Sequence, residues 1–93
     1  MSKRLSEPEI QKSLASVPGW EIKDGALSKL YKFEDFAQAM VFVNRAAELA
    51  EEADHHPDIL IRYNKVSLTL VTHSEGGLTK KDFDLAREVD LLL

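Results

Sequence analysis

Two neighbouring stretches of alternating side chains constrain the fold of this chain more than any other feature. Residues 59–63 place β-branched or aromatic side chains at every second position, and residues 66–73 repeat an apolar side chain with the same period of two. Such alternation is typical of β-strands that bury one face. The link Asn64-Lys65 predicts a tight turn, so the two stretches are expected to form an antiparallel hairpin.

A second hairpin is predicted nearer the N-terminus. Asp24-Gly25 is a strong turn signal, because both positions accept positive φ, and it separates the short strand 20–23 from the returning strand 26–33. Three helices complete the pattern: one opened by Ser6-Glu7-Pro8-Glu9, one from Glu34-Asp35 to a stop before Pro57, and one from Thr79 through Leu92. The chain is therefore expected to be one α+β domain, residues 1–93, ordered α-β-β-α-β-β-α. Its four-stranded, mainly antiparallel sheet would carry three helices on one face.

The long helix carries more apolar side chains than one helical stripe requires. Five of them follow helical spacing: Phe36, Met40, Val43, Ala47 and Ala50. Three more widen this surface: Val41, Phe42 and Leu49. The extra width indicates either contact with another subunit or a broad core face under the sheet. Because a domain of 93 residues buries only a modest core, we expect a homodimer or a homotetramer.

The composition argues against several classes of function. The formal charge is −4, which does not favour direct nucleic-acid binding, because nucleic-acid binders usually carry a basic face. The chain has no cysteine, so no disulfide or thiolate site is expected, and this suits a cytoplasmic protein. The first five residues are not followed by the apolar run of a signal peptide. No apolar run approaches the length of a membrane span, so no membrane contact is expected.

The three histidines, His55, His56 and His73, all lie in or beside the predicted hairpin of residues 59–73. A turn centred between residues 64 and 65 would place position 56 opposite position 73. The three imidazoles would then surround one spot at one end of the sheet. Histidine gains and loses a proton near neutral pH, so this arrangement predicts an acid/base site.

Carboxylates accompany the histidines. Glu51 lies four residues before His55, on the same helical face if the helix reaches that far, and Asp82, early in the last helix, is expected to reach His73. Each also has a simpler interpretation: Glu51 as a solvated charge, and Asp82 as a partner of the helix dipole. Three histidines and a carboxylate are also a donor set for zinc. Consecutive side chains on an extended backbone diverge, however, so His55 and His56 are poorly placed as joint ligands.

The spacing of these residues resembles a known family. The matching pattern is Glu51-x3-His55-His56-Pro57-x5-Tyr63-x9-His73-x8-Asp82, and the triplet Pro18-Gly19-Trp20 precedes the first strand. Both features resemble the pterin-4a-carbinolamine dehydratases, as does the order of helices and strands. The resemblance spans nearly the whole chain, and no histidine of the pattern is missing.

The resemblance implies dehydration of a 4a-hydroxytetrahydropterin, the by-product of pterin-dependent aromatic amino acid hydroxylases, to a quinonoid dihydropterin, with no metal and no organic cofactor. It implies that His55 and His73 are the acid/base groups and that His56 positions the substrate. The remaining site residues would orient imidazoles, bind the pterin or form a wall of the pocket: Glu51, Asp54, Asp82 and Trp20. Some animal members of the family also act as dimerisation cofactors of a transcription factor. The alternative function is therefore a non-enzymatic binding module.

Overall fold

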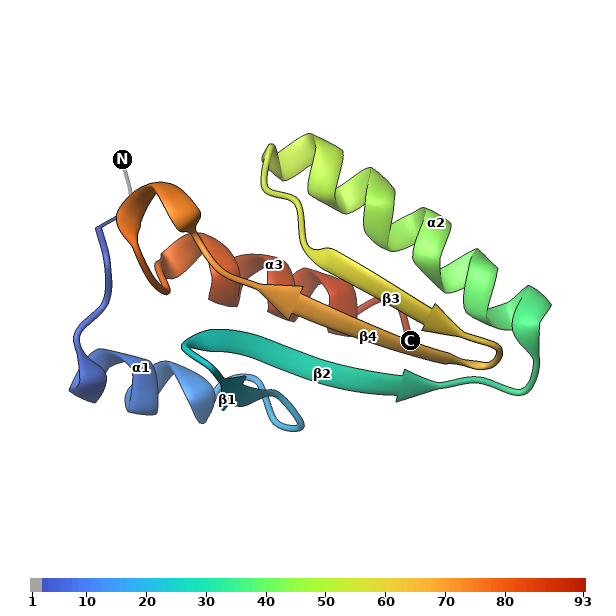
Figure 1. The fold of residues 1–93 in the computed structure, drawn as a ribbon, viewed down its shortest axis with the longest axis horizontal. Coiled ribbons are helices and arrows are strands. Elements are labelled where there is room, and N and C mark those ends of the chain that lie inside the picture. Colours follow the sequence, from blue (N-terminus) through green and yellow to red (C-terminus); the bar gives the residue numbers. More distant parts are fainter. Residues whose placement is uncertain (1–2) are drawn as a thin grey trace.

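The computed structural model describes residues 3–93 and has the predicted α+β architecture (Figure 1). Its elements are α1 (Glu7–Leu14), β1 (Glu21–Lys23), β2 (Ala26–Lys32), α2 (Phe36–Ala53), β3 (Asp58–Arg62), β4 (Lys65–Leu70), the short 3₁₀ helix η1 (His73–Glu75) and α3 (Lys80–Asp90). The strands form one sheet in the order β1-β2-β4-β3, and every neighbouring pair is antiparallel.

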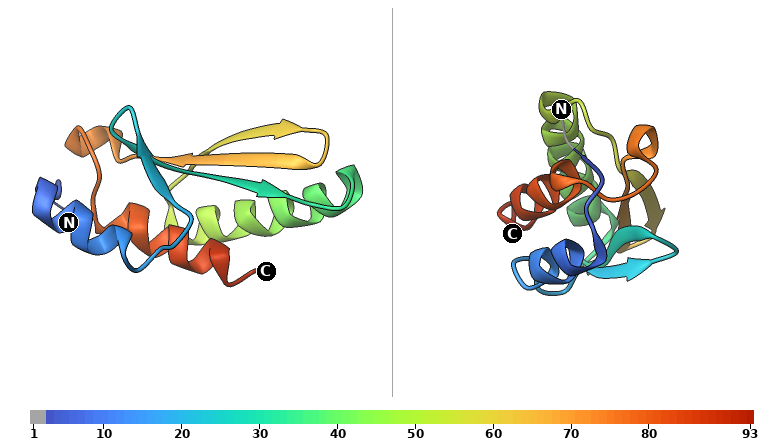
Figure 2. Two further views of the ribbon diagram at one scale, coloured as in Figure 1. Left: turned by 90° about the horizontal axis from the view of Figure 1, so that it is seen from below. Right: turned by 90° about the vertical axis from the view of Figure 1, so that its left-hand side faces the viewer.

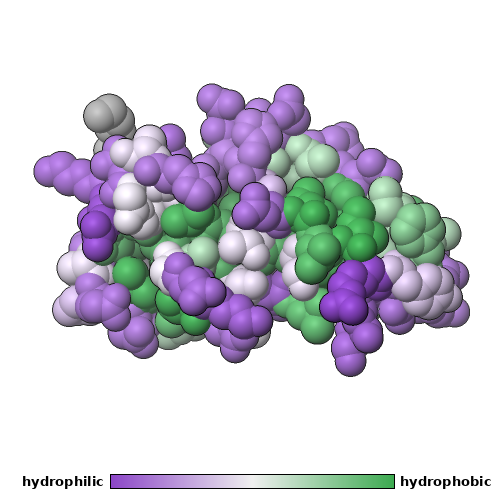
Figure 3. Space-filling model, viewed as in Figure 1, coloured by the Kyte–Doolittle hydropathy of each residue, from purple (hydrophilic) through white to green (hydrophobic). Residues whose placement is uncertain are grey.

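The three α-helices lie on one face of the sheet, and its other face is open (Figure 2). The core between the two layers includes Leu27, Leu68 and Phe83, each at most 2% exposed. On the open face, Leu30 and Leu60 flank Ser67 across three strands and are 52% and 57% exposed. Figure 3, which views this face, shows hydrophobic residues gathered between hydrophilic ones. No helix among residues 3–93 is long and apolar enough to cross a membrane.

The helix starts follow the sequence signals. Ser6 accepts a hydrogen bond from the backbone N–H of Glu9, whose carboxylate accepts one from the N–H of Ser6, which completes the predicted capping box. Thr79 caps α3, and Asp82 closes a second capping box there. The turn between β1 and β2 has φ of 50° at Asp24 and 78° at Gly25, as the pair predicted.

The register of the β3–β4 hairpin differs from the prediction. Arg62 pairs with Lys65, so the turn consists of Tyr63 and Asn64, and the pairing is shifted by two residues. A shift of two residues leaves the buried and exposed faces unchanged, so alternation alone does not select the register. Asn64 is held instead by Phe33, the residue after β2: the carbonyl of Asn64 accepts from the N–H of Phe33 at 2.8 Å, and its side-chain amide donates to the carbonyl of Phe33. Tyr63 takes the strained position, with φ of 52°.

The end of β4 also differs. We predicted that His73 ends this strand, but β4 stops at Leu70 and His73 opens η1. Strand pairing therefore does not place His73 opposite His56. The contact between these parts of the chain is made through α3, as described below.

The buried face of α2 is rotated relative to the predicted stripe. Its buried members are Ala39, Phe42, Val43, Ala46 and Ala50. Phe36 and Ala47 of the predicted stripe are exposed, and Phe42 is a core side chain that stacks near Tyr31 and Phe33. Because α2 carries alanines on both its buried and its exposed faces, spacing alone does not indicate which of them face the sheet.

Candidate functional site

The end of α2 fixes the backbone of the histidine pair. Asp54 takes the left-handed conformation, with φ of 49° and ψ of 44°, and caps the helix. The N–H of His55 then donates to the carbonyl of Ala50 at 3.0 Å. Pro57 disfavours the α conformation for the residue before it, so His56 leads the chain out of the helix toward β3. The pair therefore lies on a constrained link between a long helix and an edge strand.

His55 is bound to the first turn of α3. Its Nε2 lies 2.5 Å from Oδ1 of Asp82, and the two side chains are 11% and 0% exposed. Asp82 was expected to reach His73, but in the structure it contacts a different histidine, His55. The bond has little competition from water at this depth, which makes it a strong constraint on the ring.

Asp82 is held by two further donors. The hydroxyl of Thr72 and the backbone N–H of Thr79 both donate to Oδ2, each at 2.9 Å. The hydroxyls of Thr72 and Thr79 are also 2.8 Å apart. All three residues are buried, at 6% exposure or less. A buried carboxylate with donors on both oxygens is a well-satisfied polar group.

His73 follows Thr72 directly in the chain. The backbone groups of Thr72 and Gly77 are bonded in both directions, at 3.1 and 3.3 Å, and this bridge closes a small loop that begins with His73. Gly76 takes φ of 72°, which the tight loop requires. His73 itself is exposed. The two histidines assigned to acid/base work are therefore joined through one short series of contacts, from His55 to Asp82 to Thr72.

His56 and Glu51 form a second, exposed pair. Nε2 of His56 lies 2.6 Å from Oε2 of Glu51, and the side chains are 57% and 77% exposed. Glu51 thus contacts His56, whereas its spacing had suggested His55. Exposed ion pairs of this kind add little stability, so the pair orients His56 more than it holds the fold together.

The other two predicted site residues lie apart from this network. Asp54 contributes its left-handed backbone, and its side chain is exposed. Trp20 is 5% exposed, and its Nε1 donates to Asp90 at 3.1 Å. Asp90 is the last residue of α3 and lies about 12 Å along the helix from Asp82, at 1.5 Å per residue. A role for Trp20 as a wall of the pterin pocket stays a prediction.

Asp90 organises a separate polar cluster. Besides Trp20, it accepts hydrogen bonds from Lys29 at 3.0 Å and from the hydroxyl of Tyr31 at 2.5 Å. Burial raises the pKa of Tyr31 well above its usual range, and the neighbouring Asp90 carboxylate raises it further. The cluster joins the end of α3 to β2 through a tyrosine that stays protonated.

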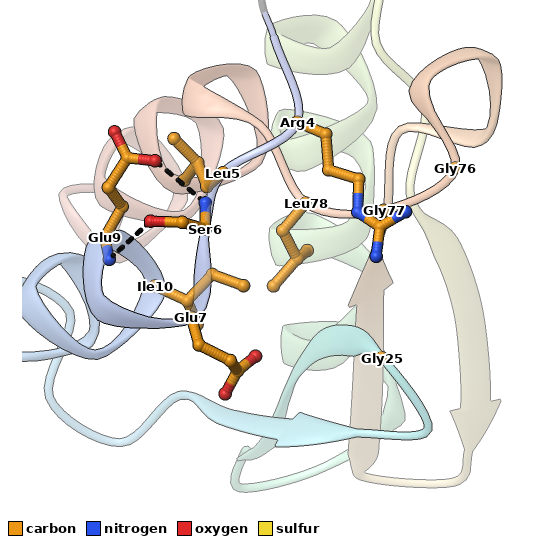
Figure 4. A pocket seen from close by; sticks show the side chains of 10 residues that line it. All are labelled: Arg4, Leu5, Ser6, Glu7, Glu9, Ile10, Gly25, Gly76, Gly77 and Leu78. Carbon is orange, nitrogen blue, oxygen red and sulfur yellow. Dashed lines mark hydrogen bonds between the residues drawn. The ribbon is translucent and has the colours of Figure 1, made fainter.

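A cavity of about 470 Å³ borders the end of the loop that begins with His73 (Figure 4). Figure 4 shows Arg4 from the N-terminal segment beside Gly77, with the Ser6–Glu9 capping box across the space. Gly76, Gly77 and Leu78 form the wall that this cavity shares with the loop. Among residues 3–93, no group of three or more histidine, aspartate or glutamate side chains is placed to hold a metal ion.

Two residues of this network were missed by the sequence analysis as site residues. Thr79 was identified only as a helix cap, and Thr72 only as a member of the alternating stretch 66–73 in the predicted hairpin of residues 59–73. The signal that relates them to the site is the capping box itself, because it buries the carboxylate of Asp82 beside the end of β4.

A four-stranded antiparallel sheet covered by helices on one face, with a part-buried histidine–aspartate pair between the end of α2 and the start of α3, defines the chain as a small α+β protein. The comparisons with known proteins make this assignment specific. Residues 3–92 match the sequence profile of the family described as "Pterin 4 alpha carbinolamine dehydratase", and the chain belongs to this family.

Individual relatives agree. A protein of Thermomicrobium roseum is 55% identical over 86 residues, 92% of each chain, and one of Acidobacterium capsulatum is 50% identical over 90 residues, 97% of this chain and 98% of its own. Both carry the provisional name pterin-4-alpha-carbinolamine dehydratase. The crystal structure of a transcriptional coactivator/pterin dehydratase from Brucella melitensis matches with a TM-score of 0.93 at 40% identity, over 97% of this chain and 98% of that one.

A more distant structure shows that the fold occurs in other roles. A pterin dehydratase-like protein identified as a RuBisCO assembly factor in the α-carboxysome matches with a TM-score of 0.64 at 30% identity. The match covers 78% of this chain and 84% of that one.

Proposed function

We propose that the protein dehydrates 4a-hydroxytetrahydropterins, and so recycles the pterin cofactor of aromatic amino acid hydroxylases. In this reaction the bond from C4a to its hydroxyl breaks, the hydroxyl leaves as water with a proton from a general acid, and N5 loses its proton. The N5 electron pair forms the double bond between C4a and N5 of the quinonoid dihydropterin. No electrons are gained or lost, so the reaction needs no redox partner. Membership of the dehydratase family supports this assignment.

The observation that carries the proposal is the contact between His55 and the buried Asp82. It orients one imidazole, and the adjoining Thr72 ties this imidazole to the loop of the second, His73. In our proposal these two histidines are the general acid and the general base. Well-placed proton transfers contribute roughly 10²- to 10⁴-fold each.

The remaining predicted residues bind substrate in this proposal. His56, oriented by Glu51, positions the pterin ring, and Asp54 offers an exposed carboxylate beside the pair. The reaction needs only proton movement, so we assign it no metal or organic cofactor. We also assign it to the cytoplasm, which the absence of cysteine suits.

A direct assay tests the activity. Purified protein is added to a freshly generated 4a-hydroxytetrahydropterin, and formation of the quinonoid dihydropterin is followed by absorbance. The expected result is a rate that increases in proportion to protein concentration. The matched control is the His55→Ala/His73→Ala double variant at the same concentration. Equal rates with the wild type, the double variant and buffer alone would rule out the proposed function.

A second candidate is a non-enzymatic binding module. The observation in its favour is that α2 exposes two large apolar side chains, Phe36 and Val41, which are 50% and 48% exposed. The names of the matched structures, a transcriptional coactivator and an assembly factor, describe such roles for those proteins. A binding role would survive loss of the histidines and fail when Val41 is charged. The double variant above therefore separates the two functions.

Self-association is part of the proposal. The sheet ends in two edge strands, β1 and β3, and α2 presents apolar side chains outward. Unpaired edges and apolar patches both favour association. We propose a homodimer or homotetramer built through these surfaces.

A further inference from the structure

We propose that Thr72 is a positioning residue for His55, acting through Asp82, and that Nδ1 of His55 is the atom that exchanges the proton with substrate. This proposal rests on the dehydratase function and deepens it. In this proposal the side chain of Thr72 has a role although it does not contact the pterin. The atom of His55 that contacts the substrate is Nδ1.

The Asp82 carboxylate is held in one orientation. Rotation about the last torsion of an aspartate is soft and roughly two-fold, so a carboxylate held by one donor exchanges its oxygens easily. Here both the hydroxyl of Thr72 and the N–H of Thr79 donate to Oδ2. One donor comes from the segment after β4 and the other from the start of α3. The carboxylate is clamped between two elements, and only Oδ1 remains for His55.

The contact with Asp82 also determines which way the hydroxyl protons of Thr72 and Thr79 point. A threonine hydroxyl has one proton to donate, and that of Thr72 goes to Asp82. In the contact between the two hydroxyls, Thr79 is therefore the donor and Thr72 the acceptor. Oδ2 of Asp82 thus accepts a hydrogen bond from the hydroxyl of Thr72, which itself accepts one from the hydroxyl of Thr79. In such a chain each hydrogen bond strengthens the other.

The contact with Asp82 determines which nitrogen of the His55 ring carries the proton. A carboxylate oxygen accepts, so in the neutral ring Nε2 carries the hydrogen that faces Asp82, and Nδ1 carries the lone pair. Among residues 3–93, every fully buried side-chain nitrogen or oxygen has a hydrogen-bond partner. Nδ1 of His55 has no partner in that part of the chain, so it is not fully buried. It is the ring atom left open to a ligand.

The position of Thr72 is independent of its hydroxyl. Its N–H and its carbonyl are both bonded to Gly77, which holds the backbone of the loop. Removing the hydroxyl should therefore leave the loop of His73 in place and release the Asp82 carboxylate. This separation makes the role of the side chain measurable.

The test compares Thr72→Val, which keeps the shape and removes the hydroxyl, with Thr72→Ser, which keeps the hydroxyl. Thr69→Val is the matched control, because Thr69 lies on β4 with its side chain toward the open face. Nitrogen chemical shifts of the histidine rings report which nitrogen is protonated. Thermal unfolding confirms that each variant is folded, and kcat and KM are measured with the 4a-hydroxytetrahydropterin.

The wild-type neutral ring of His55 should be protonated on Nε2 alone. Thr72→Val should mix the two tautomers at His55, leave the tautomer ratio of His73 unchanged and lower kcat at least about tenfold with little change in KM. Thr72→Ser and Thr69→Val should behave as the wild type. A folded Thr72→Val variant with an unchanged His55 tautomer would overturn the proposal, and so would a wild-type ring protonated on Nδ1. The nitrogen chemical shifts of the histidine rings are measured without substrate. A wild type without dehydratase activity would therefore refute the proposed function, and the tautomer of His55 would still test the role of Thr72.

Discussion

Asp82 and Asp90 stand eight residues apart at the two ends of α3, and each carboxylate contacts three hydrogen-bonding groups from elsewhere in the fold or the helix cap. Asp82 contacts His55, Thr72 and the N–H of Thr79, and Asp90 contacts Trp20, Lys29 and Tyr31. One end of the helix therefore serves the candidate site, and the other fastens the helix to the sheet. This division leads to different expectations for substitutions at the two ends.

Replacement of the histidines should dominate activity. His55→Ala or His73→Ala is expected to lower kcat at least about tenfold, because each removes a proton-transfer group. His56→Ala should raise KM more than it lowers kcat, because its exposed ring is paired with Glu51 and is assigned to substrate positioning. Steady-state kinetics with circular dichroism as the folding control decide this. Full activity in a folded His55→Ala/His73→Ala protein would refute the assignment.

Replacement of Asp90 should affect stability and spare catalysis. Asp90→Ala leaves Trp20 and Tyr31 without their acceptor, and an unmet buried donor costs about 1–3 kcal/mol. Because two donors lose their acceptor, the free energy of unfolding in urea should fall by at least this amount, while kcat is unchanged. Asp84→Ala is the control: Asp84 lies on the same helix and makes two exposed ion pairs, with Lys80 and Arg87, and its loss should cost less than about 1 kcal/mol. Equal losses for the two variants would contradict the role given to Asp90.

Tyr31 should make the fold sensitive to alkaline pH. Burial, and then the Asp90 carboxylate, raise the pKa of Tyr31 in the folded state, whereas an unfolded tyrosine ionises near pH 10. The folded state therefore holds this proton more tightly. The stabilisation is complete below about pH 10 and is lost above it, at up to about 1.4 kcal/mol per pH unit.

Tyr31→Phe removes this dependence. Urea unfolding between about pH 9 and about pH 11 should show the wild type losing at least about 1 kcal/mol more than the variant. Tyr63→Phe is the control, because Tyr63 is 67% exposed. Parallel losses in the wild type and in Tyr31→Phe would show that the proton of Tyr31 is not involved.

Catalysis should persist without metal. Dehydration of a carbinolamine requires only proton movement, and His55 and His56 each already have a carboxylate partner. Activity is expected to survive exhaustive chelation, with metal content measured on the same sample. Stoichiometric zinc bound at the histidines, with activity lost on its removal, would favour a metal site instead.

Self-association should depend on Val41 and not on Phe42. Val41 is 48% exposed on α2, so Val41→Glu should weaken assembly without unfolding the subunit. Phe42 is 4% exposed in the core, so Phe42→Glu should unfold it. Light scattering and circular dichroism distinguish the two results. A monodisperse wild-type monomer at micromolar concentration would refute the expected oligomer.

The parts of the fold that local chemistry decides were predictable from sequence. The Ser6–Glu9 capping box, the Asp24-Gly25 turn and the alternation of β4 depend on neighbouring residues and were identified correctly. The turn at Tyr63 and Asn64 was not predicted, because the register depends on a contact with Phe33, which is thirty-one residues from Asn64. The place of Phe42, either in a broad core face or at a second surface, was left open for a similar reason: burial depends on where the sheet lies, and spacing along the helix does not encode that position.

The site shows the same limit. Residue types and spacing indicated His55, His56, His73, Glu51 and Asp82, but the partners within this set were exchanged. Glu51 pairs with His56, and Asp82 pairs with His55. Distances along the chain do not determine these pairs, because the left-handed residue Asp54 redirects the backbone between the helix and the histidines. The catalytic roles themselves stay predictions.

The capping box of α3 makes the start of this helix and the candidate site one structural unit. The carboxylate that begins this helix is the same one that orients His55. The first turn of α3 is also buried, because Thr79 and Asp82 are both 0% exposed and Leu78 is 2% exposed. Its opening would expose core side chains, so it should cost a large part of the free energy of global unfolding. On heating, the contact between Asp82 and His55 should therefore be lost together with the secondary structure.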